Sequence, residues 1–116
     1  MNNKKLGSDF EKAVCHELEK LGYWVHFLTP DRRGAQPFDI IAVKDDSALA
    51  VECKTLSASQ KYFSINRIEQ NQQLAFEKWI ACGNRTPIIA IWYKEHIYYV
   101  HWNVLKKNGK VQLDNQ

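Results

Sequence analysis

Two acidic residues and a lysine border short apolar runs, at a spacing that paired strands would bring together. Asp39 precedes the run at residues 40–43, while Glu52 and Lys54 follow the run at residues 49–51. Magnesium is usually held by one or two carboxylates, with water and substrate phosphate completing its shell. A lysine beside such an ion can orient or help deprotonate an attacking water and offset charge on phosphorus. The three residues therefore predict phosphodiester hydrolysis.

The expected strand pairing places the two acids opposite each other. Residues 38–43 and 48–54 read as strands joined by a polar four-residue turn at 44–47, which indicates an antiparallel hairpin. In that register Asp39 faces Glu52, with Cβ atoms about 5 Å apart, where like charges are destabilising. Something must offset the repulsion.

Side chains alternate along a strand, so Lys54 falls on the same face as Glu52, whereas Cys53 points to the other face. The Cys53 thiol is therefore predicted to belong to the core and not to be the reagent.

A plainer reading remains open for these residues. Asp39 would cap a loop, and Glu52 and Lys54 would form a solvated pair on an edge strand. The flanking apolar runs favour the functional reading, because they look like central strands with both faces covered, where charged residues are rarely unpaired.

Two helices and five strands are expected to position these groups. A first helix begins at a capping box, Ser8 to Glu11, and ends before Gly22; its apolar face is Phe10, Val14, Leu18 and Leu21. A second helix begins near Asn66 and ends at Gly83. The strands are expected at residues 23–28, 38–43, 48–54, 88–93 and 96–102, with a basic loop at 29–37. The order is αβββαββ, an α/β fold.

Length and composition indicate one globular domain. The chain has 116 residues, 45% of them hydrophobic, and a net charge of +3, which permits nucleic-acid binding without requiring it. We expect one nuclease domain over 1–116, with 1–7 and 103–116 flexible or peripheral. Three cysteines without a C-x-x-C spacing favour the reducing cytoplasm, and no apolar stretch approaches the ~20 residues that span a membrane.

The motif resembles a known nuclease superfamily. Pro37-Phe38-Asp39, a hairpin and Glu52-Cys53-Lys54 are similar to the PD-(D/E)xK nucleases, which share a restriction-endonuclease-like mixed sheet flanked by helices. Residues 7–12, 18–23 and 52–55 resemble the archaeal-type Holliday junction resolvases, and residues 63–72 resemble the RecU-type resolvases.

The resemblance implies roles by position. The metal-binding acids fall on Asp39 and Glu52, with the backbone carbonyl of Cys53 as a further ligand, and the catalytic lysine falls on Lys54. The helix-borne acid falls on Glu11, which lies beside the apolar stripe and is equally readable as part of the capping box. The implied cofactor is Mg²⁺, with Mn²⁺ as a substitute, and no small-molecule cofactor.

Gln72 is placed within the apolar stripe of the second helix, four residues after Ile68 and four before Phe76. A buried amide needs partners. The resolvase-like pattern has a glutamine near the active site here, which implies a role in holding water, metal or phosphate; alternatively, Gln72 bonds to the backbone.

Basic residues near the motif are candidates for DNA contact. Arg32 and Arg33 lie in the loop just before Asp39 and are expected to grip phosphates. The track would extend through residues that are individually readable as ordinary solvated charges: Lys4, Lys5, Lys12, Lys61 and Arg67.

The sequence thus predicts a homodimeric, metal-dependent endonuclease that makes paired cuts in four-way DNA junctions. A two-fold dimer would supply two matching sites from one short chain. Another DNA endonuclease of this fold, or a catalytically idle DNA-binding module, remains an alternative. We expect a cytoplasmic protein of bacterial, archaeal or phage origin.

Overall fold

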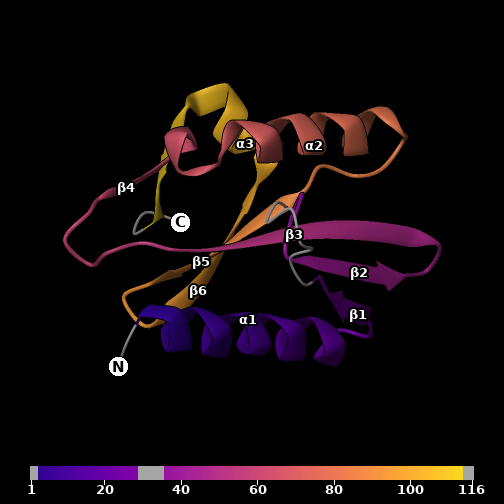
Figure 1. The fold of residues 1–116 in the computed structure, drawn as a ribbon, viewed down its shortest axis with the longest axis horizontal. Helices are drawn as coiled ribbons and strands as arrows, with labels where there is room; N and C mark the ends of the chain where they lie inside the picture. The colour runs from indigo at the N-terminus through magenta and orange to yellow at the C-terminus, as the bar shows by residue number, and fades with distance from the viewer. Residues whose placement is uncertain (1–2, 29–35, 114–116) are drawn as a thin grey trace.

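A five-stranded mixed sheet lies between two layers of helices (Figure 1). The computed structural model describes residues 3–28 and 36–113, except for the side chains of residues 3–8. Helix α1 (Asn3–Lys20) covers one face of the sheet, and α2 (Gln70–Ala81) and α3 (Trp102–Asn108) lie over the other. The predicted α/β fold, a mixed sheet flanked by helices, is confirmed.

The strands run β1 (Trp24–Phe27), β2 (Ile40–Lys44), β3 (Ser47–Thr55), β5 (Ile88–Tyr93) and β6 (His96–His101). Their order across the sheet is β1-β2-β3-β5-β6, so β3 is the central strand. The β3–β5 pair is parallel, and the chain crosses between these strands through α2; the other pairs are antiparallel.

The predicted register of the β2–β3 hairpin is confirmed, since Ile40 pairs with Val51 and Val43 with Ala48. The turn itself has two residues and not four. Asp45 and Asp46 have φ angles of 52° and 62°, the left-handed conformation that matches the twist of a hairpin. The register is the same for either turn length, because the two-residue turn only adds the pair Lys44–Ser47 to the ladder.

The first helix begins earlier than its capping signal. Because α1 starts at Asn3, Ser8 is already inside the helix, and the predicted capping box is wrong. Phe10, Val14 and Leu18 are buried as expected, but Leu21 is 62% exposed because it lies beyond the last helical residue. Gly22 ends this region at a φ of +96°, a conformation that glycine adopts at no steric cost.

The second helix begins later than predicted. A 3₁₀ helix, η1 (Ile65–Arg67), precedes it, and the chain is extended at Ile68 and Glu69 before α2 starts at Gln70. The Ser64 hydroxyl accepts a hydrogen bond from the Asn66 N–H at 3.1 Å, which caps η1. The capping signal that pointed to Asn66 is therefore wrong, because the cap that forms is Ser64 and it starts η1 and not α2.

The C-terminal tail is part of the fold as far as Leu113, contrary to the expectation that 103–116 is flexible or peripheral. The last strand of the sheet stops at His101, and Trp102 opens α3. A second small sheet pairs β7 (Lys110–Gln112) with β4 (Tyr62–Ser64), neither of which was predicted. Leu105 and Leu113 are fully buried. The lysine-rich composition of residues 103–116 gave no indication that these few residues belong to the core.

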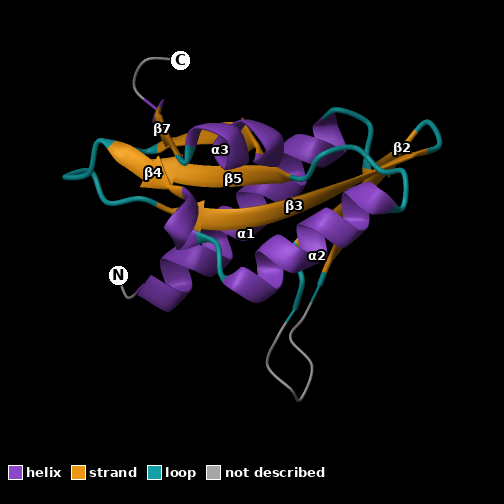
Figure 2. Ribbon diagram, turned by 90° about the horizontal axis from the view of Figure 1, so that it is seen from above, coloured by secondary structure: helices purple, strands orange, loops and turns teal. Residues whose placement is uncertain are grey.

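Figure 2 shows the fold from above. Each face of the sheet carries its own apolar core. On the α1 side the core contains Phe10, Val14, Leu18, Ile40, Ala42, Leu49, Val51 and Ala90. On the other side, residues of α2 and α3 pack with alternate residues of β3, β5 and β6. The middle of β3 is therefore covered on both faces, as predicted.

In the described part of the chain, no helix is both long enough and apolar enough to cross a membrane.

The C-terminal helix is expected to be needed for stability. Replacing buried Leu105 with alanine removes core contacts and should lower the free energy of unfolding by about 2–4 kcal/mol. Urea denaturation measures this change, with exposed Lys107→Ala in the same helix as the control. A loss below about 0.5 kcal/mol for Leu105→Ala would show that α3 is peripheral after all.

Candidate active site beside the central strand

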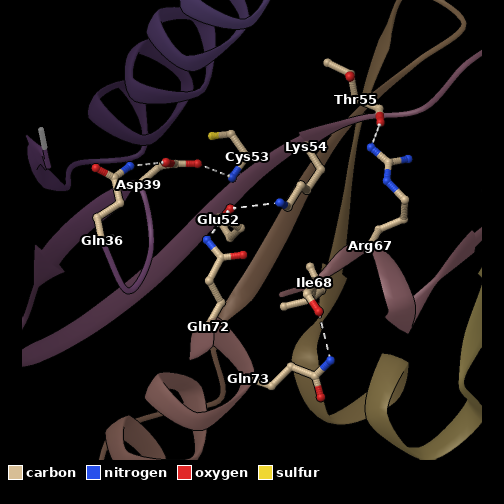
Figure 3. Close-up of polar contacts among 10 residues, drawn as sticks. All are labelled: Gln36, Asp39, Glu52, Cys53, Lys54, Thr55, Arg67, Ile68, Gln72 and Gln73. Carbon is tan, nitrogen blue, oxygen red and sulfur yellow. Dashed lines mark hydrogen bonds and ion pairs between the residues drawn. The ribbon is translucent and has the colours of Figure 1, made fainter. Parts of the chain in front are cut away.

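Asp39 is held at the beginning of β2, beside β3 (Figure 3). Its backbone N–H donates to the carbonyl of Val51 at 3.1 Å, which ties the residue before β2 to β3. Its carboxylate Oδ2 accepts a hydrogen bond from the Cys53 N–H at 2.8 Å, and Oδ1 accepts one from Gln36 Nε2 at 2.6 Å. The Asp39 carboxylate therefore lies against the backbone of β3 next to Glu52.

Glu52 lies in the interior of the central strand and is only 3% exposed. Its Oε2 accepts a hydrogen bond from Gln72 Nε2 at 2.8 Å and lies 3.4 Å from Lys54 Nζ. Its Oε1 is buried and has no hydrogen-bond partner among the residues that the structure describes. Within the described part of the chain, one carboxylate oxygen of Glu52 is thus paired and the other is not.

The surroundings of Glu52 penalise its negative charge. Burial, and after it the charge of Asp39, raise the pKa of Glu52 to about 8, although Lys54 and Gln72 oppose the shift. Burial and the charge of Asp39 likewise raise the pKa of Glu11 to about 7. The site therefore favours either protons or a cation near these carboxyl groups.

The donor set fits a hard divalent cation. Carboxylate oxygens of Asp39 and Glu52 converge, and the unpartnered Glu52 Oε1 offers a lone pair. Within the described residues no three His, Cys, Asp or Glu side chains form a ready metal-binding group. A cation here would have two carboxylates at most and would keep several waters, which is how Mg²⁺ is commonly bound.

The plainer reading of the acid and lysine pair is wrong. Glu52 is on the central strand rather than an edge strand, and Glu52 and Asp39 are 3% and 6% exposed. Lys54 is the more accessible partner, with a side chain 19% exposed. A buried acid pair beside a partly accessible lysine resembles a reaction site more than a solvated ion pair.

Glu11 approaches the site from α1. The helix starts well before it, so its reading as a capping residue is removed, and its charge interacts with that of Asp39. It lines a hollow of about 500 Å³ whose walls come from α1 and β1. The structure thus brings Glu11 toward the acid pair, on the α1 side of the sheet.

Gln72 is buried at 7% exposure, as its position in the apolar stripe predicted. The partner of its amide is the Glu52 carboxylate and not the backbone. The neighbouring Gln73 donates to the backbone carbonyl of Ile68 at 2.9 Å instead. Of the two adjacent glutamines, Gln72 alone reaches the acid pair (Figure 3).

Cys53 packs with the core residues on the α1 side, as the alternation of the strand predicted. Burial raises the pKa of its thiol far above the ordinary value, and the charges of Asp39, Glu11 and Glu52 add to this. The thiol therefore stays protonated, which fits its predicted role as a core group.

The structure describes only some of the predicted DNA-contacting residues. Lys12 and Lys61 are exposed, and Arg67 donates to the carbonyl of Thr55 at 2.8 Å, one residue after Lys54. Lys4 and Lys5 lie on α1, with side chains outside the described part. Arg32 and Arg33 lie outside the described residues.

Gln36 is a site residue that the sequence did not reveal. It donates to Asp39 from three residues upstream, within a segment that reads as an ordinary loop. A polar side chain next to Pro37 carries no specific signal, so only the folded chain shows that its amide meets the Asp39 carboxylate.

Three comparisons relate the chain to known proteins. The family model of the archaeal Holliday junction resolvase (Hjc) matches residues 2–116. The crossover junction endodeoxyribonuclease Hjc of Methanocaldococcus jannaschii is 30% identical over 104 residues, which are 90% of this chain and 71% of that protein. The solved structure of Archaeoglobus fulgidus Hjc, a Holliday junction resolvase, matches with a TM-score of 0.64 at 20% identity, over 91% of this chain and 86% of the other.

The raised pKa of Glu52 predicts how stability depends on pH in metal-free buffer. Between pH 4.5 and about 8, the folded protein retains a proton on Glu52 that the unfolded chain releases. Stability therefore falls as pH rises through this window. Glu52→Gln removes the charge, so at pH 9 it should be more stable than wild type by a few kcal/mol, on the order of the linkage energy.

Thermal unfolding at pH 4 and pH 9 measures this difference, which should vanish at the lower pH. Exposed Glu69→Gln is the matched control, at the start of α2. Equal stability of Glu52→Gln and wild type at pH 9 would contradict the predicted penalty.

Proposed function

The chain belongs to the archaeal Holliday junction resolvase family, and we infer from this membership that it is an endodeoxyribonuclease that resolves four-way DNA junctions. The observation that supports hydrolysis most directly is the buried pair of Asp39 and Glu52 beside Lys54, with Glu52 Oε1 unpartnered among the described residues. An idle DNA-binding module would have no need to bury two mutually repelling acids.

We propose that Asp39, Glu52 and the backbone carbonyl of Cys53 hold a divalent cation, Mg²⁺ by preference, with Mn²⁺ as a substitute. The oxygen-only donor set and the small number of carboxylates support this choice. When bound, the cation would polarise the scissile phosphate and make water a better nucleophile at neutral pH. Its positive charge would also favour ionised carboxylates in a place where burial and repulsion oppose them.

We propose that Lys54 acts on the water and the phosphate. Its ammonium lies 3.4 Å from Glu52 Oε2 and remains partly accessible, so it can face substrate while the carboxylate keeps it in place. A positive charge there stabilises the negative charge that develops on the phosphoryl oxygens during attack. Lys54 can also orient the attacking water through one of its N–H donors.

Glu11 and Gln72 complete the proposed site from opposite faces of the sheet. Gln72 donates to Glu52 Oε2, which leaves Oε1 as the oxygen directed to the cation. Glu11, with a pKa of about 7, can accept or release a proton near neutral pH. This property suits a group that exchanges protons with water around the reacting phosphate.

DNA would be bound by basic residues around this site. We propose phosphate contacts by Arg32 and Arg33, by Lys12 on α1, and by Lys61 and Arg67 beyond the end of β3, with Lys4 and Lys5 extending the track. The Arg67 guanidinium is fixed by the Thr55 carbonyl and lies 5.4 Å from the Phe63 ring centroid, so its remaining N–H donors are held in place near Lys54.

Paired cutting supports a homodimer. Symmetric resolution needs equivalent nicks in two strands, and each chain offers one acid pair, so we propose that two chains act around a two-fold axis. All three cysteines are free thiols, which fits our proposal that the protein works in a reducing cytoplasm.

The proposed catalytic roles predict a separation of cutting from binding. Asp39→Asn, Glu52→Gln and Lys54→Ala should each lower the cutting of a labelled four-way junction with Mg²⁺ by at least about a hundredfold, while junction binding in EDTA persists. Gel assays on junction, nicked duplex and plain duplex measure both properties.

Asp45→Asn in the hairpin turn is the control and should cut like wild type. Equal cutting of plain duplex by the wild type would contradict junction selectivity. Junction binding without any cutting by the wild type would favour an idle module instead.

The loop arginines make a prediction about salt. If Arg32 and Arg33 each neutralise one phosphate, the double alanine variant should reduce the slope of log affinity against log salt concentration by about two. Fluorescence anisotropy with a labelled junction measures this slope, with exposed Arg85→Ala as the control. An unchanged slope would exclude phosphate contacts by this pair.

A further inference from the structure

Both oxygens of the Asp39 carboxylate accept a hydrogen bond from the protein. Cys53 donates its backbone N–H to Oδ2 at 2.8 Å, and Gln36 donates its side-chain Nε2 to Oδ1 at 2.6 Å (Figure 3). Two donors on separate oxygens fix the rotation of this short side chain. Each oxygen has a further lone pair, so both can still accept another partner.

Gln36 is attached to a firmly held segment. Phe38, two residues later, is buried in the α2-side core, where its ring meets Trp79 edge-on at 5.3 Å between centroids. Asp39 itself is tied to β3 through its backbone N–H. The amide of Gln36 is therefore presented to Asp39 by backbone that the core and the sheet both restrain.

The direction of the Gln36 amide is set by the acid. A carboxylate can only accept hydrogen bonds, so the NH₂ group must face it and the amide oxygen must point elsewhere. That oxygen, Gln36 Oε1, is buried with no hydrogen-bond partner among the described residues. Within the described part of the chain, the Gln36 amide therefore makes its hydrogen bond to the acid through its NH₂ group alone.

The same arrangement occurs at the second acid. Gln72 donates its amide to Glu52, and its own Oε1 is likewise buried without a partner in the described part of the chain. Each acid thus receives one glutamine amide, from the loop before β2 in one case and from α2 in the other. The repetition indicates that orientation of the carboxylates is favoured over satisfaction of the amides.

A glutamine amide donates hydrogen bonds without carrying a charge, unlike a lysine or arginine side chain. Lysine or arginine in place of Gln36 would also donate to Asp39, but its charge would neutralise the acid and repel an incoming cation. An amide supplies the donor without the charge. The acid pair is thereby oriented in advance while its attraction for a cation is retained.

We propose that Gln36 is a positioning residue of the cation site, which holds the Asp39 carboxylate in its binding orientation without an opposing charge. Gln72 is its counterpart at Glu52. The inference rests on the proposed function and deepens it, because it adds a residue that touches neither the DNA nor the cation but determines how tightly the cation binds.

The test measures cation binding directly, with the full chain and without DNA. Calorimetric titration of Gln36→Met with Mn²⁺ should give a dissociation constant about tenfold above that of wild type, since methionine keeps the length of the side chain but donates nothing. The melting temperature in metal-free buffer and the junction affinity in EDTA should match wild type, which a general structural defect would not allow.

Two further variants separate positioning from simple folding effects. Gln36→Lys restores a donor but adds charge, so it should bind Mn²⁺ at least as weakly as Gln36→Met. Gln73→Met removes an amide that donates only to backbone, and it should leave the dissociation constant unchanged.

Wild-type affinity for Mn²⁺ in Gln36→Met would overturn the proposal, as would an equal loss in Gln73→Met. Wild-type affinity in Gln36→Lys would overturn the argument from charge. If the wild type binds Mn²⁺ and cuts junctions in any of these cases, the proposed function stands and only the role of Gln36 fails. A wild type that neither binds Mn²⁺ nor cuts junctions would overturn both.

Discussion

The carboxylates of Asp39, just before β2, and Glu52, on β3, lie buried side by side and repel each other, and many of the surrounding contacts offset that repulsion. The β2–β3 register brings Asp39 to Glu52, and burial raises the pKa of Glu52 to about 8 with a further contribution from Asp39. In low dielectric such a charge pair is costly unless protons or a cation reduce it. A site that stores this repulsion has a built-in affinity for a small divalent ion.

The scaffold holds the acids in place from both sides of the sheet. The α1 core fixes the faces of β2 and β3 that point away from Glu52, and α2 carries Gln72 to the Glu52 carboxylate. The C-terminal helix α3 and strand β7 help to close the second core and brace the chain around α2. Rigid strands and packed helices position a reacting group more closely than a free loop does. The tail therefore contributes to the site although it lies far from it in sequence.

Neutral donors and one lysine divide the work at this site. In our proposal, the amides of Gln36 and Gln72 orient the carboxylates, and the charge of Lys54 stabilises the phosphate under attack. Family membership indicates the substrate, a four-way junction, and the acid pair beside Lys54 is the proposed site of its hydrolysis. We propose a two-fold assembly because each chain offers one acid pair, whereas resolution of a junction needs two cuts.

Local patterns determined the central hairpin, its register and hence the meeting of Asp39 with Glu52, because strand alternation and turn position are properties of neighbouring residues. The motif also determined the family. The capping signals did not predict where the helices begin, since Ser8 is inside α1 and α2 starts at Gln70 after a 3₁₀ turn. Tertiary structure decided that a lysine-rich tail supplies Leu105 and Leu113 to the core, and it holds the segment in which Gln36 meets Asp39 against the core and β3. These two outcomes depend on contacts with distant segments, which no periodicity within a single segment encodes.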